Sequence, residues 1–298
     1  MGGWIRVDVE VAAEAEEAAA EALRALGAPG TEHGEGPAGS ARVTAYFPAE
    51  LAPRLAAGLP QLTARLAASG LQPWPPRVRQ EPIDDANWAE QWKEHFHPLH
   101  IGALWIRPSW EQAEPPPGAK TMILDPGLAF GTGTHATTRL CLEALQVYLA
   151  PGDVVVDVGT GSGILAMAAA LLGAGRVVAV DVDPVAVRVA RANVELNRLQ
   201  WAVEVLEGST DAAERSLKAM KPEGAEVVVG NLLTPIIVEL APDLARLAAP
   251  GGRVLASGIA AGQEGEAEAA LEAAGLRVVG RTVDEGWVLL VAERGKAG

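Results

Sequence analysis

The residues best suited to bind a nucleotide-like ligand lie between positions 153 and 183. A valine-rich run is followed there by Gly159, Gly161 and Gly163, and a second valine-rich run ends at Asp181. Glycines allow the backbone to approach a ligand closely, and the helix expected after them offers unpaired N–H groups at its start. A carboxylate at the end of the second strand can accept both hydroxyls of a ribose. We therefore predict a nucleotide cofactor site at these four residues.

The glycine spacing separates two kinds of nucleotide. A dinucleotide-binding turn would need glycine at position 164, where this chain has Ile164. The pattern is instead Asp157-x-Gly-x-Gly-x-Gly, which is similar to motif I of the class I S-adenosylmethionine-dependent methyltransferases. The alternative is a structural glycine turn in another α/β protein, but the buried strand before it and the acidic strand end after it favour a cofactor. The predicted cofactor is S-adenosylmethionine.

A second glycine-rich segment, residues 125–138, contains three glycines and four threonines. One interpretation is a tight turn that caps the helix expected after it. The other is a loop that folds over the ligand, with Phe130, Gly131 and Thr132 against it. We favour the second interpretation because the segment leads through that helix into the glycine turn.

Asn231 follows a short hydrophobic run, residues 225–229, which we expect to be a strand. Its side-chain carbonyl could accept an N–H of an amine and thereby aim the nitrogen lone pair at a methyl group. Alternatively, the side chain holds the turn before the next helix. Thr234 and Pro235 suit the N-cap and the first helical position, so that Asn231 is not needed as a cap. We predict Asn231 as the catalytic residue and identify no general base.

The chain has one cysteine, Cys141, so that no internal disulfide can form, and an intracellular setting fits. We expect Cys141 to be a buried thiol and not a nucleophile, since it lies on the apolar side of a predicted helix. His95, His97 and His100 lie close together in the sequence, but no cysteine or paired carboxylate completes a ligand set at standard spacing. We predict no metal site.

Composition and charge exclude several classes of protein. The 298 residues are 49% hydrophobic and 21% charged, as in a globular protein, and the net charge is −14. A protein that binds duplex nucleic acid normally carries a basic excess, so we expect no direct nucleic-acid binding. The N-terminus lacks the apolar region of a signal peptide, and no apolar run reaches membrane-spanning length. We expect a cytoplasmic monomer.

The order of the predicted elements defines an α/β architecture. From residue 101 to residue 298 strands and helices alternate and end in a hairpin, which is typical of a seven-stranded, doubly wound Rossmann-like domain with an antiparallel last strand. Before it we expect a small α+β domain at 1–71 and a linker at 72–100, which is rich in proline up to residue 83 and carries a helix at 84–96. In detail we expect strands at 4–11, 43–47 and 101–108, helices at 12–26 and 49–69, the latter divided at Pro53 and Pro60, and a glycine-rich loop at 30–41.

Four ordered motifs resemble the bacterial PrmA family, whose members methylate ribosomal protein L11. The first is Asn87-Trp-x-x-x-Trp-Lys-x-x-Phe-x-Pro and the second is Ile106-Arg-Pro-Ser-Trp. The third is the segment 125–138, and the fourth is motif I. The resemblance covers residues 84–292 by motif and the N-terminal domain by architecture only.

The resemblance implies an S-adenosylmethionine-dependent methyltransferase domain that acts on lysine ε-amines, the N-terminal α-amine, or both. It also implies that Thr138, Gly159, Asp181 and Asn231 contact the cofactor and that the small N-terminal domain grips the protein substrate. One departure is Asn231-Leu-Leu-Thr, where the family usually has Asn-Ile-Leu-Ala. The change is conservative beside the asparagine.

Three other functions compete with this one. The enzyme could methylate a lysine of another protein or a small amine. A nucleic-acid methyltransferase fits less well, because the charge is acidic and no Asn-Pro-Pro-aromatic motif is present. A non-catalytic cofactor-binding module would leave Asn231 and Phe130 without a purpose.

Overall fold

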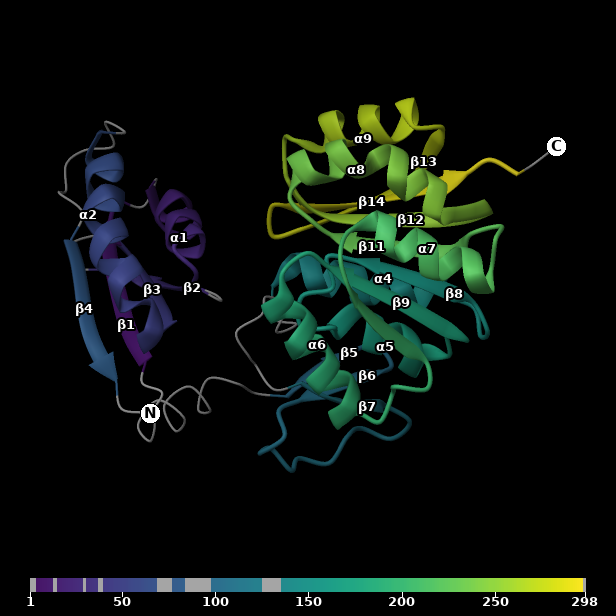
Figure 1. Cartoon of the computed structure of the whole chain (residues 1–298), viewed down its shortest axis with the longest axis horizontal. Helices are drawn as coiled ribbons and strands as arrows, with labels where there is room; N and C mark the ends of the chain where they lie inside the picture. The colour runs from purple at the N-terminus through teal and green to yellow at the C-terminus, as the bar shows by residue number, and fades with distance from the viewer. Residues whose placement is uncertain are drawn as a thin grey trace. The chain divides into compact units, whose positions relative to one another are not determined.

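The computed structural model describes residues 4–12, 15–28, 31–36, 40–68, 77–83, 98–124 and 135–296. The chain divides into two compact units, Met1–Phe96 and His97–Gly298, which are considered separately below (Figure 1). The expected linker helix at 84–96, with Trp88 and Trp92, lies outside the described residues, as do His95 and His97.

The N-terminal unit is a four-stranded antiparallel sheet with helices packed on one face. The strand order is β2-β3-β1-β4, so β1 and β3 are central and β4 is an edge strand. Two helices follow β1 and β3 in the sequence, which gives the order β-α-β-β-α-β. The elements are β1 (Trp4–Val11), α1 (Glu16–Ala25), β2 (Thr31–Glu35), β3 (Ala41–Pro48), a short 3₁₀ turn (Ala49–Leu51), α2 (Ala52–Ala68) and β4 (Arg77–Ile83).

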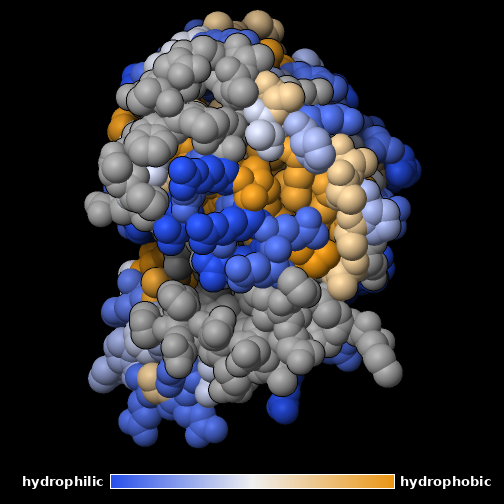
Figure 2. Space-filling model, turned by 90° about the vertical axis from the view of Figure 1, so that its left-hand side faces the viewer, coloured by the Kyte–Doolittle hydropathy of each residue, from blue (hydrophilic) through white to orange (hydrophobic). Residues whose placement is uncertain are grey.

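The alternation of residues along β1 decides which face of this sheet is buried. Val7 and Val9 are fully buried and form one core with Leu23 of α1 and Leu55 of α2. The alternating residues Arg6, Asp8 and Glu10 are polar and only partly buried, and Asp8 accepts a hydrogen bond from Thr44 on β3 (2.6 Å). Figure 2, which views this unit, shows hydrophilic side chains gathered beside an apolar area.

Three local predictions for the N-terminal unit were wrong. Residues 31–35, expected in a loop, form β2, because pairing with β3 outweighs the low strand propensity of a glycine-containing segment. Residues 77–83, expected in the linker, form β4, and Pro82 is tolerated because β4 is an edge strand. Helix α2 runs through Pro60 without a break, since this residue lies on the exposed side of the helix, where water can solvate the freed carbonyl.

The C-terminal unit contains the expected seven-stranded sheet, in the order β10-β9-β8-β11-β12-β14-β13. The five strands β8 to β12 run parallel, and β14 is antiparallel to both of its neighbours. The doubly wound prediction is therefore confirmed. The elements are α4 (Ala136–Tyr148), β8 (Val154–Val158), α5 (Ile164–Leu172), β9 (Arg176–Asp181), α6 (Pro184–Leu196), β10 (Val203–Glu207), α7 (Thr210–Met220), β11 (Ala225–Asn231), α8 (Thr234–Leu247), β12 (Ala248–Ala260), α9 (Glu264–Ala273), β13 (Leu276–Asp284) and β14 (Trp287–Arg294).

Helices cover both faces of the large sheet, so its strands are buried on both sides (Figure 1). Val155 belongs to the core formed with α4, α5 and α6, whereas its neighbour Val156 belongs to the core formed with α7, α8 and α9. None of the described helices is long and apolar enough to span a membrane.

A second sheet of three short strands precedes α4 and packs into the same core as α4 and α5. The single strand expected at 101–108 is instead a hairpin, because Gly102 adopts a left-handed conformation (φ 57°) and reverses the chain. Gln146 of α4 holds this turn by accepting from Ala103 N–H (2.6 Å). The strands are β5 (Leu99–Ile101), β6 (Leu104–Arg107) and β7 (Lys120–Ile123).

Candidate active site

The three predicted glycines form the turn between β8 and α5. Gly159, Gly161 and Gly163 have φ values of 73°, 55° and 84°, a region that L side chains rarely adopt. A Cβ atom at Gly159 would also lie 2.5 Å from Cδ2 of Leu232 in the loop after β11. The turn therefore requires glycine both for its backbone conformation and for the close approach of the neighbouring loop.

Asp181 ends β9 beside this turn, as predicted. Its Oδ2 accepts the N–H of Gly161 (2.9 Å), and its Oδ1 accepts the N–H of Asp183 (2.9 Å). The carboxylate is thus fixed in orientation and only partly buried, and each oxygen retains a lone pair for a further donor. These features fit a ribose whose hydroxyls approach from the solvent side.

Asp157, near the end of β8, holds the glycine turn by hydrogen bonds to its buried side chain. Its Oδ2 accepts from the hydroxyl of Thr160 (2.6 Å) and from the N–H of Ala166 in α5 (3.1 Å), while its buried Oδ1 has no hydrogen-bond partner among the described residues. Burial raises the pKa of Asp157 to about 7, although the two donated hydrogen bonds oppose this effect.

Cys141 of α4 is buried, as the sequence indicated. Burial raises the pKa of its thiol well above its ordinary value, and the negative charge of Asp157 adds to the effect. A thiol held in its neutral form is a poor nucleophile. Cys141 therefore belongs to the core and not to the chemistry.

Asn231, at the end of β11, points its amide nitrogen at the first turn of α4. Its Nδ2 donates to the hydroxyl oxygens of Thr137 (3.1 Å) and Thr138 (3.3 Å). The hydroxyl of Thr137 in turn lies 2.8 Å from Nδ1 of His135, which also accepts the N–H of Thr137 as the N-cap of α4. Because Nδ2 is used in this way, Oδ1 of Asn231 is left for another donor, and no described residue supplies one.

The prediction that Thr234 caps α8 was wrong. Leu233 occupies the N-cap position without a side-chain hydrogen bond, and Thr234 is the first helical residue. The hydroxyl of Thr234 is buried and has no partner among the described residues. The turn is held instead by the backbone of Leu232, whose N–H donates to Ser257 O (2.8 Å). Asn231 is therefore not needed to hold this turn, because the backbone of Leu232 holds it. The sequence had suggested a different reason, namely a cap by Thr234.

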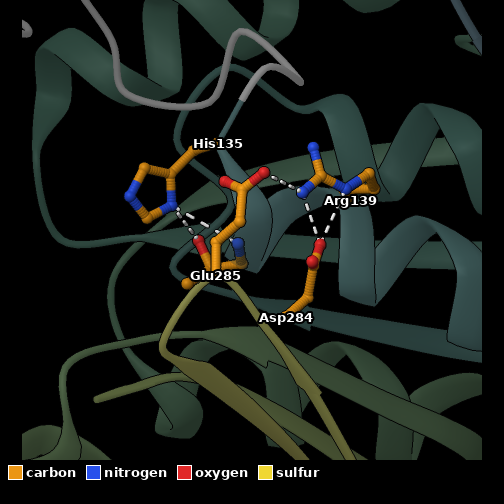
Figure 3. Close-up of polar contacts among 5 residues, drawn as sticks. His135, Arg139, Asp284 and Glu285 are labelled. Carbon is orange, nitrogen blue, oxygen red and sulfur yellow. Dashed lines mark hydrogen bonds and ion pairs between the residues drawn. The ribbon is translucent and has the colours of Figure 1, made fainter. Parts of the chain in front are cut away.

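The hairpin formed by β13 and β14 contacts the same turn of α4, which the sequence did not reveal (Figure 3). The guanidinium of Arg139 donates from Nε to Asp284 Oδ2 (2.9 Å), binds the same oxygen through Nη2, and lies 3.1 Å from Glu285 Oε1. The ring of Trp287 packs edge-on against that of His135, with centroids 5.0 Å apart. A separation of 145 residues between Arg139 and Asp284 leaves no local signal that could have predicted this contact.

Phe130, Gly131 and Thr132 lie outside the described residues. Strand β7, which leads into their segment, is anchored by Asn197, whose side chain accepts the N–H of Ile123 (2.7 Å) and donates to its carbonyl (2.6 Å).

Among the residues that the structure describes, no group of three or more His, Cys, Asp or Glu side chains could hold a metal ion.

The placed residues lie together at the carboxyl ends of the parallel strands. Because β8, β9 and β11 run parallel, their carboxyl ends carry the glycine turn, Asp181 and Asn231 side by side. The chain proceeds from β8 to β10 on one side of β8 and then returns to β11 on the other, which creates the switch point where such sheets bind ligands. The fold and this site define a class I methyltransferase.

Comparison with known proteins identifies the family. The model of the family "Ribosomal protein L11 methyltransferase (PrmA)" matches residues 3–295. The chain therefore belongs to the PrmA family, whose members transfer a methyl group from S-adenosylmethionine to ribosomal protein L11. The resemblance stated from the motifs, the enzyme class and the cofactor are thereby confirmed.

Individual relatives agree with this assignment. The chain is 37% identical over 318 residues to the ribosomal protein L11 methyltransferase of Brevibacillus brevis, with 98% of this chain and 99% of that protein covered. It is 42% identical over 255 residues to that of Carboxydothermus hydrogenoformans, covering 85% and 80%. A crystal structure of the ribosomal protein L11 methylase from Lactobacillus delbrueckii is 32% identical, with a TM-score of 0.59 over 67% of this chain and all of that one.

Proposed function

We propose that methyl transfer takes place between the glycine turn and Asn231, with Asn231 aiming the acceptor amine. The observation that carries this proposal is the orientation of the Asn231 amide. Its nitrogen donates to Thr137 and Thr138, so that Oδ1 is the atom left to accept an N–H from an amine. An amine whose N–H is accepted by Oδ1 has its lone pair directed away from Asn231, which restricts the orientations available for an in-line displacement.

In this proposal the cofactor residues divide the work. When bound, S-adenosylmethionine supplies a sulfonium methyl group that is attacked by an amine lone pair. Gly159, Gly161 and Gly163 admit the cofactor to the backbone, and Asp181 accepts its ribose hydroxyls. Thr138 contributes to the cofactor side of the site, next to the amide of Asn231. Phe130, Gly131 and Thr132 remain predicted cofactor contacts.

The acceptor must lose a proton before it reacts, because an ammonium group has no lone pair. For a lysine with a pKa of ~10.4 this costs roughly 4–5 kcal/mol at neutral pH, and for an α-amine with a pKa of ~8 about 1 kcal/mol. Asn231 cannot take this proton. Once the proton has been lost, Oδ1 can accept an N–H of the neutral amine, whose lone pair then points away from Asn231.

Kinetics of Asn231→Ala test the role of the side chain. We expect turnover on ribosomal protein L11 to fall at least tenfold while the dissociation constant of S-adenosylmethionine changes less. The matched variant Thr137→Val removes one hydroxyl that orients the amide but keeps Asn231, and it should show a smaller loss of turnover in the same direction. Equal losses of turnover and cofactor affinity in Asn231→Ala would make Asn231 a cofactor ligand or a structural residue and end the proposal.

The N-terminal unit has a separate role in this proposal, which is to grip the protein substrate. The unit has its own buried core, and the placed site residues all lie in the C-terminal unit. The polar face of its sheet, which includes the exposed Arg79 and Glu81 of β4, is available for contacts with a protein. A truncated chain that starts at residue 97 should bind S-adenosylmethionine with near-native affinity and lose methylation of ribosomal protein L11. Full activity of this truncated chain on that substrate would remove the N-terminal unit from substrate binding.

The setting proposed for the enzyme is the cytoplasm, where its ribosomal substrate is made, and the working form is a monomer that binds no nucleic acid directly. The net charge of −14 supports both the absence of nucleic-acid binding and the attraction of a basic protein substrate.

A further inference from the structure

The β13–β14 hairpin ends in a turn whose sequence is unfavourable for its conformation. Asp284 pairs with Trp287, so the turn consists of Glu285 and Gly286 alone, and both have positive φ (47° and 78°). Such two-residue turns favour Asn, Asp or Gly at the first position, because other residues are strained there. Among the described non-glycine residues only Glu285 and Arg198 have positive φ. We therefore expect an interaction outside the turn to offset the strain of a glutamate at this position.

This interaction is made with Arg139 of α4. The carboxylate of Glu285 reaches Arg139 (3.1 Å), which is already bound to Asp284 through Nε and Nη2. One guanidinium thus ties the carboxylates of Asp284 and Glu285 to the first turn of α4 (Figure 3). Trp287, the next residue after the turn, adds a ring contact to His135. These five residues, His135, Arg139, Asp284, Glu285 and Trp287, are called the hairpin clamp below.

The hairpin clamp is connected to Asn231 by a short chain of hydrogen bonds. His135 Nδ1 contacts the hydroxyl of Thr137, and this hydroxyl accepts from Nδ2 of Asn231. Since Nδ1 also accepts the N–H of Thr137, it carries no proton, and the Thr137 hydroxyl must donate to it. Thr137 is then an acceptor toward Asn231, and the amide is held with its nitrogen toward α4 and its oxygen away from it.

We propose that the hairpin clamp is a positioning element for methyl transfer, in which Arg139 fixes the start of α4 and thereby sets the orientation of the Asn231 amide. In this proposal Arg139, Asp284 and Glu285 make no contact with the cofactor or with the acceptor amine. They act through Thr137 and Thr138. This inference rests on the proposed role of Asn231, and the experiment below separates a failure of one from a failure of the other.

An isolated ion pair on a surface would have no such effect. Exposed pairs contribute little to stability and nothing to a distant site. Arg139 differs from such a pair because its side chain is only 29% exposed and engages two carboxylates at once, of which Asp284 is 36% and Glu285 67% exposed. The same hairpin provides a comparison, since Arg281 of β13 forms its ion pair with Glu264 of α9 and not with a residue of α4.

The test uses the whole chain and four variants, Arg139→Gln, Arg139→Lys, Glu285→Asn and, as the control, Arg281→Gln. For each we would measure turnover on ribosomal protein L11, the dissociation constant of S-adenosylmethionine and the melting temperature. Glu285→Asn should keep or raise the melting temperature, because asparagine suits the turn, and still lower turnover about threefold or more. Arg139→Gln should lower turnover about tenfold, Arg139→Lys should restore part of it, and Arg281→Gln should stay within twofold of the wild type.

A double-mutant cycle decides whether Arg139 acts through Asn231. When Asn231 is already alanine, Arg139→Gln should cost no further turnover, whereas a merely structural role would give additive losses. Wild-type turnover of both Arg139→Gln and Glu285→Asn would overturn the clamp. So would additive losses, or a loss of cofactor affinity with Arg139→Gln that Glu285→Asn does not share. Wild-type turnover of Asn231→Ala alone would instead refute the proposed function.

Discussion

The buried carboxyl group of Asp157 should make the stability of this protein depend on pH in an unusual direction. Burial raises its pKa to about 7, from an ordinary value of 3.8, and the charge of Asp181 adds a smaller effect in the same direction. Between these two pH values the folded chain holds a proton that the unfolded chain releases. Raising the pH through this window therefore favours the unfolded state.

The size of the effect follows from the number of protons. While the folded state binds one proton more than the unfolded state, the free energy of unfolding falls by about 1.4 kcal/mol per pH unit. Over the window from pH ~4 to pH ~7 the loss from this group is roughly 4 kcal/mol, and above pH ~7 it levels off. The contribution is fully present below the unfolded pKa and is lost as the pH rises through the folded pKa.

Urea denaturation of the wild type and of Asp157→Asn at several pH values between about 4.5 and 8.5 measures this effect as the free energy of unfolding at each pH. Asparagine has the same shape, and its carbonyl can still accept from Thr160 and Ala166, but it does not titrate. The other carboxylates contribute equally to both proteins, so the difference between the two curves isolates Asp157. We expect the wild type to lose stability relative to the variant as the pH rises. Parallel curves would show that Asp157 is ionised throughout and that burial does not control its charge.

Three further predictions concern single residues. Asp181→Ala should weaken binding of S-adenosylmethionine by about 1.5–3 kcal/mol, as for lost charged hydrogen bonds, and unchanged affinity by calorimetry in a folded variant would remove Asp181 from the site. Gly159→Ala should destabilise the fold by about 1–2 kcal/mol through its left-handed backbone, even when Leu232→Ala removes the steric contact; full recovery in the double variant would show that only the contact matters. Thr234→Ala should leave the free energy of unfolding unchanged or raise it by up to about 1 kcal/mol, since the buried hydroxyl has no partner among the described residues, and Thr234→Ser is the control. A clear loss of stability with alanine would point to a partner for the hydroxyl.

The large sheet and its cofactor edge could be predicted because their signals are local. A valine run, a glycine turn and an acidic strand end each occupy a few adjacent residues, and parallel pairing then brings Gly159, Asp181 and Asn231 to one edge. The antiparallel last strand was likewise expected, from the hairpin predicted at the end of the chain.

The errors arose where distant contacts override local preference. The strand at Arg77–Ile83 exists because β1 offers it a partner, and the hairpin at Gly102 is held by Gln146 of α4. Thr234 is a favourable N-cap residue by type, yet the backbone of Leu232 closes the turn one residue earlier. The contact of Arg139 with the β13–β14 turn joins residues 145 positions apart, so neither spacing nor composition could indicate it.

The most direct test of the account is transfer of a radiolabelled methyl group from S-adenosylmethionine to purified ribosomal protein L11 in a single turnover, with the wild type and Asn231→Ala compared at saturating cofactor. The account predicts that the wild type labels amino groups of the ribosomal protein and that the variant binds the cofactor but transfers the label at least tenfold more slowly. Absence of label from the ribosomal protein, or transfer by the variant at the wild-type rate, would contradict it.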